Sequence, residues 1–166
     1  METLKTEKKS NNVLFAVIFL AVIIIIVIVI IKPFSIYSIY EPLSKGKVLI
    51  NGQTTISVEI AKTPEQQEIG LKGREKLNDG NGMLFVYKDK RYYNFWMDGM
   101  KIPIDIIWID DNKIIDITKN APVPADLNNP DIFRPASEVN YVLEVKAGYA
   151  DKNNIKIGDT VEYLIK

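Results

Sequence analysis

The sequence predicts a mainly β domain, an antiparallel sandwich or barrel with one or two short helices, carried behind a single transmembrane helix. Residues 13–31 are nineteen consecutive apolar residues, which predicts the membrane span. Seven later segments alternate apolar and polar residues with a period of two, which is typical of β-strands. The chain is therefore expected to contain a short tail (1–12), the span (13–31), a juxtamembrane linker (32–46) and a β-rich globular domain (47–166).

The apolar run has the length and composition of a membrane-spanning helix. At about 1.5 Å of rise per residue it spans roughly 28 Å, close to the roughly 30 Å hydrocarbon core of a bilayer. Seventeen of its residues are Val, Ile, Leu or Phe, so the summed free energy favours insertion. A cleavable signal peptide has a shorter run and a small-x-small cleavage site, whereas Lys32, Pro33 and Phe34 follow here. A buried core helix is rarely apolar on every face.

The flanking charges predict the orientation. Lys5, Lys8 and Lys9 precede the run, while its near downstream flank holds only Lys32. Because cytoplasmic flanks carry the excess of Lys and Arg, we expect a cytoplasmic N-terminus and a cell-membrane protein whose domain lies outside the cytoplasm. The absence of cysteine is compatible with either side of the membrane.

The linker and the domain composition narrow the range of partners. Tyr37 and Tyr40 of the linker are placed where amphipathic rings lie among lipid headgroups. Residues 47–166 carry sixteen Lys and Arg against eighteen Asp and Glu, a net charge of −2. Nucleic-acid binding needs a clustered basic patch, so no nucleic acid is expected as a partner.

The elements of the domain follow one another at short spacing. Ile56, Val58 and Ile60 alternate with polar residues and predict a strand over residues 54–62 that is covered on one face. The same pattern predicts further strands over 83–87, 91–98, 104–110, 113–119, 141–146 and 160–165.

Turn and helix signals separate these strands. Asp111 and Asn112 predict a two-residue hairpin. Thr63, Pro64 and Gln66 predict a helix that opens with a capping box, and Gly70 and Gly73 limit its length. A second helical turn is expected over residues 148–153, before a turn at Gly158 and Asp159.

Five segments together resemble the bacterial and archaeal "domain of unknown function 192" family. They are GMLFVY (82–87), FWM (95–97), IPIDIIWID (102–110), YVLEVKAG (141–148) and IKIGD (155–159), and IGLKGR (69–74) is similar to the family's helix segment. The resemblance implies a jelly-roll-like β-sandwich, often exported or membrane-anchored, and it implies no catalytic residue. Asp98 and Gly99 stand where the family usually has Lys and Asn.

Residue types that are absent exclude several chemistries. The chain has no His and no Cys, so it cannot build a Ser-His-Asp triad, a cysteine nucleophile or a zinc site of the usual ligands. It has no phosphate-binding loop and no dinucleotide fingerprint, so no cofactor is expected. Carboxylate chemistry, lysine chemistry and oxygen-ligand metals remain.

Two carboxylates in apolar strands are the candidate catalytic groups. Asp105 shares its strand face with Ile107 and Ile109, and a carboxylate there needs a partner. It is either an acid or base in a cleft or a structural group that accepts hydrogen bonds from the backbone or an arginine such as Arg74. Glu144 poses the same question, although its face also carries Lys146 and it can simply meet water.

An aromatic segment and a long loop supply the candidate binding residues. Phe95 and Met97 share one strand face and Trp96 lies on the other, so one set is expected in the core and the other at the surface, where aromatic rings can hold a sugar or a peptide. The candidate binding residues are Trp96, Met97, Met100, Arg74 and Arg134. The oxygen-rich loop 120–138 offers Asp126, Asn128 and Asp131 as weak candidate metal ligands, but it matches no calcium-loop spacing and no metal is expected.

Three classes of function follow. The first is a non-enzymatic, membrane-tethered module outside the cytoplasm that binds a small molecule, a glycan or a partner. The second is a carboxylate enzyme that acts on saccharides, which would need two suitably spaced carboxyl groups. The third is a structural partner of another membrane protein. A cleft with facing carboxylates would favour the enzyme, and a flat apolar patch would favour the structural partner.

Overall fold

The structure, a computed structural model, describes residues 17–27, 42–126 and 130–165. The chain separates into two units, Met1–Pro42 and Leu43–Lys166. In the first unit, residues 17–27 form a helix whose side chains are exposed. Within the described ranges, no helix is long and apolar enough to cross a membrane. The expected tail, both ends of the expected span and most of the expected linker lie outside the described residues.

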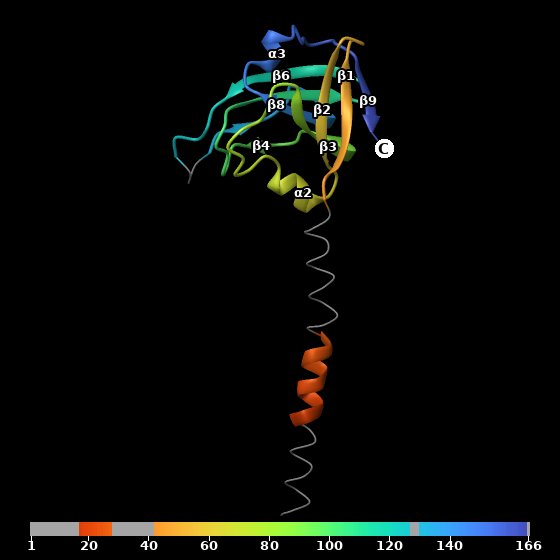
Figure 1. Ribbon diagram of the computed structural model, residues 1–166, viewed down its shortest axis with the longest axis vertical. Helices are drawn as coiled ribbons and strands as arrows, with labels where there is room; N and C mark the ends of the chain where they lie inside the picture. The colour runs from red at the N-terminus through yellow and green to blue at the C-terminus, as the bar shows by residue number, and fades with distance from the viewer. Residues whose placement is uncertain (1–16, 28–41, 127–129, 166) are drawn as a thin grey trace, which may run out of the picture. The chain divides into compact units, whose positions relative to one another are not determined.

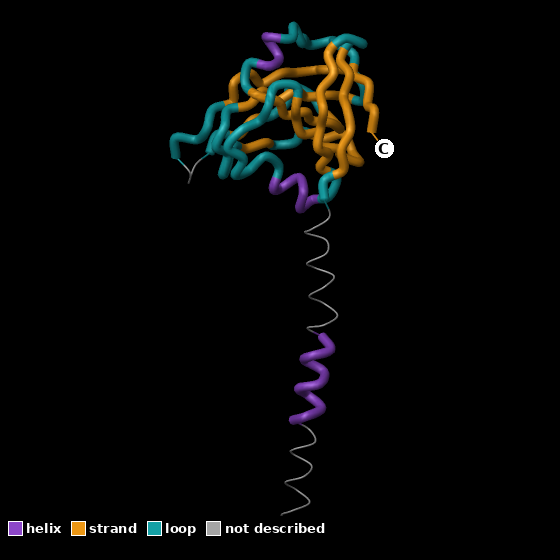
Figure 2. Tube along the Cα trace, in the orientation of Figure 1, coloured by secondary structure: helices purple, strands orange, loops and turns teal. Residues whose placement is uncertain are grey.

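The second unit is mainly β, with one large mixed sheet and two short helices (Figure 1). Its seven-stranded sheet has the order β6-β5-β8-β3-β2-β1-β9, and β4 and β7 form a separate pair. The strands are β1 (Ser44–Ile50), β2 (Thr54–Ala61), β3 (Asn81–Arg91), β4 (Phe95–Trp96), β5 (Ile104–Asp110), β6 (Lys113–Ala121), β7 (Ile132–Phe133), β8 (Val139–Lys146) and β9 (Val161–Ile165). The helices are α2 (Pro64–Ile69) and α3 (Tyr149–Lys152), and they lie at opposite ends of this unit (Figure 2).

One pair of neighbouring strands departs from the expected antiparallel arrangement. β2 and β3 are parallel, whereas the other neighbours in the large sheet are antiparallel. Residues 62–80, which include α2, connect the two strands. A parallel pair needs a crossover of about a dozen residues or more, and this segment supplies one. The sheet is therefore mixed, and the crossover carries α2 across its face.

The two edges of the large sheet meet. β6 and β9 stand at opposite ends of the strand order, yet Lys113 and Thr160 form an isolated antiparallel bridge. Next to it, the Ile114 amide donates to the carbonyl of Asp159 (3.0 Å) and the Val161 amide donates to the carbonyl of Asn112 (2.9 Å). In Figure 1, β1, β2 and β9 accordingly run across the direction of β6 and β8. The domain is thus one sheet curled toward closure, which is nearer to the expected barrel than to the two stacked sheets of the expected sandwich.

Both faces of the central strands β3, β5 and β8 are largely buried, and the domain has two apolar clusters. The first joins residues of β1 and β2 to residues of β5 and β6, strands that are distant in the sheet order, and therefore fills the inside of the curl; it includes Val48, Ile56, Ile107 and Ile114. The second lies on the outer face of β3, β5 and β8; it includes Met83, Phe85, Trp108 and Val142 together with Phe95 and Met97 from β4 and the loop after it. The segment between β3 and β5 thus covers the outer face and forms a pocket there with α2.

Candidate functional site

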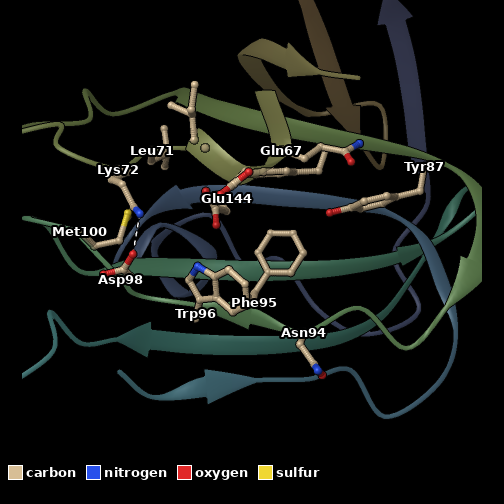
Figure 3. Close-up of a pocket in the computed structure, with 14 residues that line it drawn as sticks. Gln67, Leu71, Lys72, Tyr87, Asn94, Phe95, Trp96, Asp98, Met100 and Glu144 are labelled. Carbon is tan, nitrogen blue, oxygen red and sulfur yellow. Dashed lines mark hydrogen bonds and ion pairs between the residues drawn. The ribbon is translucent and has the colours of Figure 1, made fainter. Parts of the chain in front are cut away.

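A pocket of about 180 Å³ opens on the outer face of the sheet (Figure 3). Its walls come from four parts of the chain: α2 and the turn after it, β3, β4 with the loop that follows, and β8. The side chains that give it its chemistry are Gln67, Leu71, Lys72, Phe85, Tyr87, Phe95, Trp96, Asp98, Met100 and Glu144. The pocket therefore combines aromatic walls, a charged rim and one carboxyl group from the sheet.

Local hydrogen bonds hold α2 as one wall. The capping box predicted at Thr63 is present, since the Gln66 amide donates to Thr63 Oγ1 (3.2 Å) and the Thr63 amide donates to Gln66 Oε1 (3.2 Å). Gln67 Nε2 then donates to the carbonyl of Val86 (2.9 Å) and ties the helix to β3. A six-residue helix is only marginally stable by itself, so these hydrogen bonds determine the position of α2 at the pocket.

At the rim of the pocket, the turn after α2 is bonded to the loop after β4. Lys72 Nζ lies 2.5 Å from Asp98 Oδ2, and the Gly73 amide donates to the carbonyl of Gly99 (2.9 Å). Gly99 has a φ of +65°, and a Cβ atom there would lie 2.6 Å from Lys72 Cγ. Glycine at position 99 therefore avoids both a strained backbone and a clash with this Lys72 conformation, and Asp98 neutralises the rim lysine.

Aromatic rings form the floor and one side of the pocket. Phe95 packs edge-on against Phe85, with ring centroids 4.9 Å apart, and edge-on against Trp108 at 5.3 Å. Trp96 lies at the rim with 53% of its surface exposed. Tyr87 stacks on Tyr93, and burial raises the pKa of Tyr87, so its phenol stays neutral. The expected division of this segment is confirmed, because Phe95 and Met97 are buried while Trp96 is exposed.

Glu144 is the unusual group of the pocket. It lies opposite Ile106 in the β5–β8 ladder and is only 6% exposed. Among the residues that the structure describes, no group forms a hydrogen bond with Oε2, which is buried. Burial raises the pKa of Glu144 to about 8, against an opposing attraction from Arg74. At pH 7 the group is therefore mostly a neutral carboxylic acid, and most of its side chain is removed from bulk water.

Arg74 lies near Glu144 but is bonded elsewhere. Its Nη1 donates to Glu59 Oε1 (3.0 Å), and its Nη2 donates to Glu59 Oε2. The pKa of Glu59 is lowered, first by the hydrogen bond from Arg74. Because its guanidinium is committed to this two-pronged contact, Arg74 acts on Glu144 only through its charge.

Asp105 has a different environment on the other face of the sheet. It is completely buried and accepts three backbone hydrogen bonds, from the amides of Asn120 (2.8 Å), Gly148 (3.1 Å) and Ala150 (2.9 Å). These contacts agree with the structural alternative, although Arg74 as the donor is wrong. Asp105 pairs with Val145, the neighbour of Glu144, so the two carboxylates point to opposite faces. The structure does not bring them together in one site.

The remaining candidate residues are dispersed. Met100 lines the pocket, whereas Met97 is 1% exposed and belongs to the core. Arg134 stacks over the ring of Tyr92, with its Cζ 5.2 Å from the centroid. Asp126 and Asp131 are exposed in the long loop, and Asn128 lies outside the described residues. In the described part of the chain, no three His, Cys, Asp or Glu residues are grouped as a metal site would need.

A second cavity has Arg74 in its wall and shares no lining residue with the first. It measures about 600 Å³, and Lys45, Lys47, Glu59, Arg74 and Lys76 are the charged residues that line it. Its arginine and its glutamate are paired with each other, so it holds no buried polar atom that needs a ligand. The smaller pocket is therefore the stronger candidate site.

Comparison with known proteins places residues 47–163 in the family described as uncharacterised ACR, DUF192. A UPF0127 protein of Pyrococcus abyssi is 27% identical over 124 residues, which cover 70% of this chain and 97% of that protein. A solved structure from Sinorhizobium meliloti, described as a candidate transcription regulator, has 29% identity and a TM-score of 0.66 over 74% of this chain and 95% of its own. One of unknown function from Novosphingobium aromaticivorans has 32% identity and a TM-score of 0.66 over 74% of this chain and 88% of its own.

Proposed function

Because the chain belongs to the DUF192 family of uncharacterised proteins, we propose its function from its pocket: it is a membrane-anchored, extracytoplasmic module that binds a small molecule without catalysing a reaction. The observation that carries this proposal is Glu144 at the pocket. A buried polar atom without a hydrogen bond costs free energy, and native proteins retain few of them. A ligand that bonds to the carboxyl group of Glu144 would offset part of the cost of burying that group.

The composition of the pocket supports ligand binding. Small-molecule sites are usually concave and mostly apolar, with a few polar groups that fix the orientation of the ligand. Phe85, Phe95 and Trp96 supply the apolar surface, and Glu144 supplies the buried polar group. A pocket that combines a perturbed pKa with such walls is a candidate functional site.

The alternative functions have weaker support. A saccharide-cleaving enzyme needs two carboxyl groups that flank one bond, and Asp105 and Glu144 lie on opposite faces of the sheet. A structural role would use the exposed strip in which Trp96 pairs with Ile132 across β4 and β7, and this strip is small. The regulator described for Sinorhizobium meliloti would imply a nucleic-acid partner, but the net charge of −2 over residues 47–166 does not favour one.

Two properties of the first unit support the membrane anchor. The run of nineteen apolar residues has the length of a bilayer core. The part of it that is described, residues 17–27, is helical with every side chain exposed. The lysines before the run favour the extracytoplasmic side for the domain.

A thermal-shift screen of single-ring compounds tests the binding proposal on the full chain in detergent micelles. Compounds that bind the pocket should raise the unfolding temperature of the parent chain. Trp96→Ala should remove most of this rise, because it deletes the exposed ring at the rim. Ile157→Ala removes an exposed apolar side chain outside the pocket and should preserve the rise. Equal responses of the two variants to every compound would reject the pocket as the binding site.

A further inference from the structure

We propose that this pocket selects a small organic cation: one apolar ring that carries an ammonium group, with the ammonium bonded to Glu144 and the ring against the aromatic wall. This inference rests on the proposed function, because it names the class of ligand for the same site. It follows from three features, namely the charges around the pocket, the chemistry of its walls and its volume.

Charge compensation leaves Glu144 as the group that needs a partner. Lys72 and Asp98 form an ion pair at the rim, and Arg74 and Glu59, neither of which lines the pocket, form another. Glu68 also lines the pocket but is exposed to water. Of the charged side chains described around this pocket, only Glu144 is both buried and without a hydrogen bond. A cation would therefore meet one uncompensated carboxyl group and no competing buried charge.

The walls favour a cation over a neutral or anionic ligand. The faces of aromatic rings carry negative electrostatic potential and attract an ammonium group. Phe95 and Trp96 lie below the carboxyl group of Glu144 in Figure 3, and Tyr87 lies to one side. An ammonium group offers three N–H donors as well as charge, whereas a hydroxyl group offers one donor and no charge. A carboxylate ligand would be repelled by Glu144 when Glu144 is ionised, and it would gain no charge attraction when Glu144 is protonated.

The volume limits the ligand to one ring and a short substituent. The pocket measures about 180 Å³. A protein cavity of about 150 Å³ lined by apolar side chains holds benzene. A benzene ring with an aminomethyl group is therefore close to the capacity of this pocket, and a fused two-ring ligand would extend into solvent past Trp96.

Binding of such a cation is coupled to a proton. Burial raises the pKa of Glu144 to about 8, so below pH 8 the cation displaces a proton from the carboxyl group. The groups that face Glu144 or line the same pocket are cationic Arg74 and Lys72, anionic Asp98 and Glu68, and the neutral phenol of Tyr87. We therefore expect cation affinity to rise with pH between pH 6 and pH 8.

Isothermal titration of the full chain in detergent micelles with benzylamine and benzyl alcohol tests this inference. At pH 8 benzylamine should bind at least about tenfold tighter than benzyl alcohol. Its affinity should fall about five- to tenfold for each pH unit down to pH 6, with release of close to one proton at pH 7. The affinity for benzyl alcohol should not fall in this way.

Two variants complete the experiment. Glu144→Gln should reduce the affinity for benzylamine to that for benzyl alcohol and remove its pH dependence. Glu162→Gln removes an exposed carboxylate of β9 and should leave both titrations unchanged. Equal affinity of the parent chain for the two compounds would reject the cation and leave the binding pocket standing. Binding of neither compound would contradict the proposed function and this inference together.

Discussion

At the scale of single residues, Asp105 and Glu144 occupy neighbouring positions in the β5–β8 ladder but differ in their partners. Asp105 accepts three backbone hydrogen bonds, two of them from amides at the start of α3. Glu144 faces an aromatic pocket and has a raised pKa. The first group is bonded within the fold, and we propose that the second binds a ligand.

Asp105→Asn should destabilise the domain. The amide of asparagine can accept two of the three hydrogen bonds, but its NH₂ group then faces the third N–H donor. Loss of charge-assisted bonds of this kind costs about 1.5 to 3 kcal/mol of unfolding free energy. Urea denaturation measures the cost, and Asp131→Asn, at an exposed loop position, should remain within about 0.5 kcal/mol of the parent. An Asp105→Asn chain as stable as the parent would contradict the structural role.

Glu144→Gln should have the opposite effect, and the effect should depend on pH. The folded pKa of about 8 lies above the unfolded value of 4.5, so the folded chain holds a proton that the unfolded chain loses between these pH values. Parent stability should therefore fall as pH rises from about 4.5 to about 8. The variant lacks this loss and should be more stable by roughly 3 to 5 kcal/mol above pH 8, with little difference at pH 5. Thermal denaturation across this range measures the slope, and parallel curves for the two chains would show that the acid is not buried.

At the scale of elements, α2 has two roles. It is part of the crossover between the parallel strands β2 and β3, and it forms one wall of the pocket. Thr63 holds the first turn of α2, and Gln67 holds the helix on β3. The stability of this short element and the shape of the pocket therefore depend on the same few hydrogen bonds.

Thr63→Ala should lower both stability and ligand affinity. It removes the side-chain acceptor of the capping box, which typically costs about 1 kcal/mol. Chemical denaturation measures this loss, and the affinity for a pocket ligand should fall with it because α2 is less well held. Lys62→Ala, at the exposed neighbouring position, serves as the control. Reduced stability with unchanged affinity would separate the helix from the pocket.

Elements with strong local signals are predictable from the sequence. The alternation over 104–110 and the Asp111–Asn112 turn predict β5 and the hairpin to β6, and the structure has both. β1 lies partly in the expected linker, although Asn51 and Gly52, which both have positive φ in the observed turn, form a known hairpin signal before β2. The parallel pairing of β2 and β3 is not local, because a capped helix between two strands is compatible with several sheet orders.

The pocket was only partly predictable for the same reason. Alternation distinguishes exposed Trp96 from buried Phe95, and the carboxylate at position 144 among apolar residues marks it as unusual. The contacts of Lys72 with Asp98 and of Arg74 with Glu59 span 26 and 15 residues. Sequence spacing does not define such contacts. It could not show that Arg74 pairs with Glu59 and not with Glu144, or that the backbone supplies the donors to Asp105.

At the scale of the whole molecule, we propose that the first unit anchors the chain and that the second binds the ligand. The two units are compact separately, and the pocket lies entirely within the second. The proposed ligand site therefore uses no residue of the first unit, whose proposed role is to keep the domain at the membrane surface.

Charged residues in the apolar run should release the chain from membranes. A lysine near the centre of a spanning helix costs about 2.5 to 3.5 kcal/mol, so Ile23→Lys with Ile24→Lys should offset the several kcal/mol that favour insertion. Cell fractionation after alkaline extraction measures the outcome, with Ile23→Leu and Ile24→Leu as the apolar control. Recovery of the unaltered chain in the soluble fraction would contradict the anchor.

The most direct test of a buried, ligand-binding Glu144 is an NMR pH titration of its carboxyl carbon resonance with and without benzylamine. We expect a midpoint near pH 8 without the compound, because the acid is buried, and a lower midpoint with it, because a bound cation stabilises the carboxylate. A midpoint near 4.5 that the compound does not move would show that Glu144 is a solvated glutamate outside any binding site.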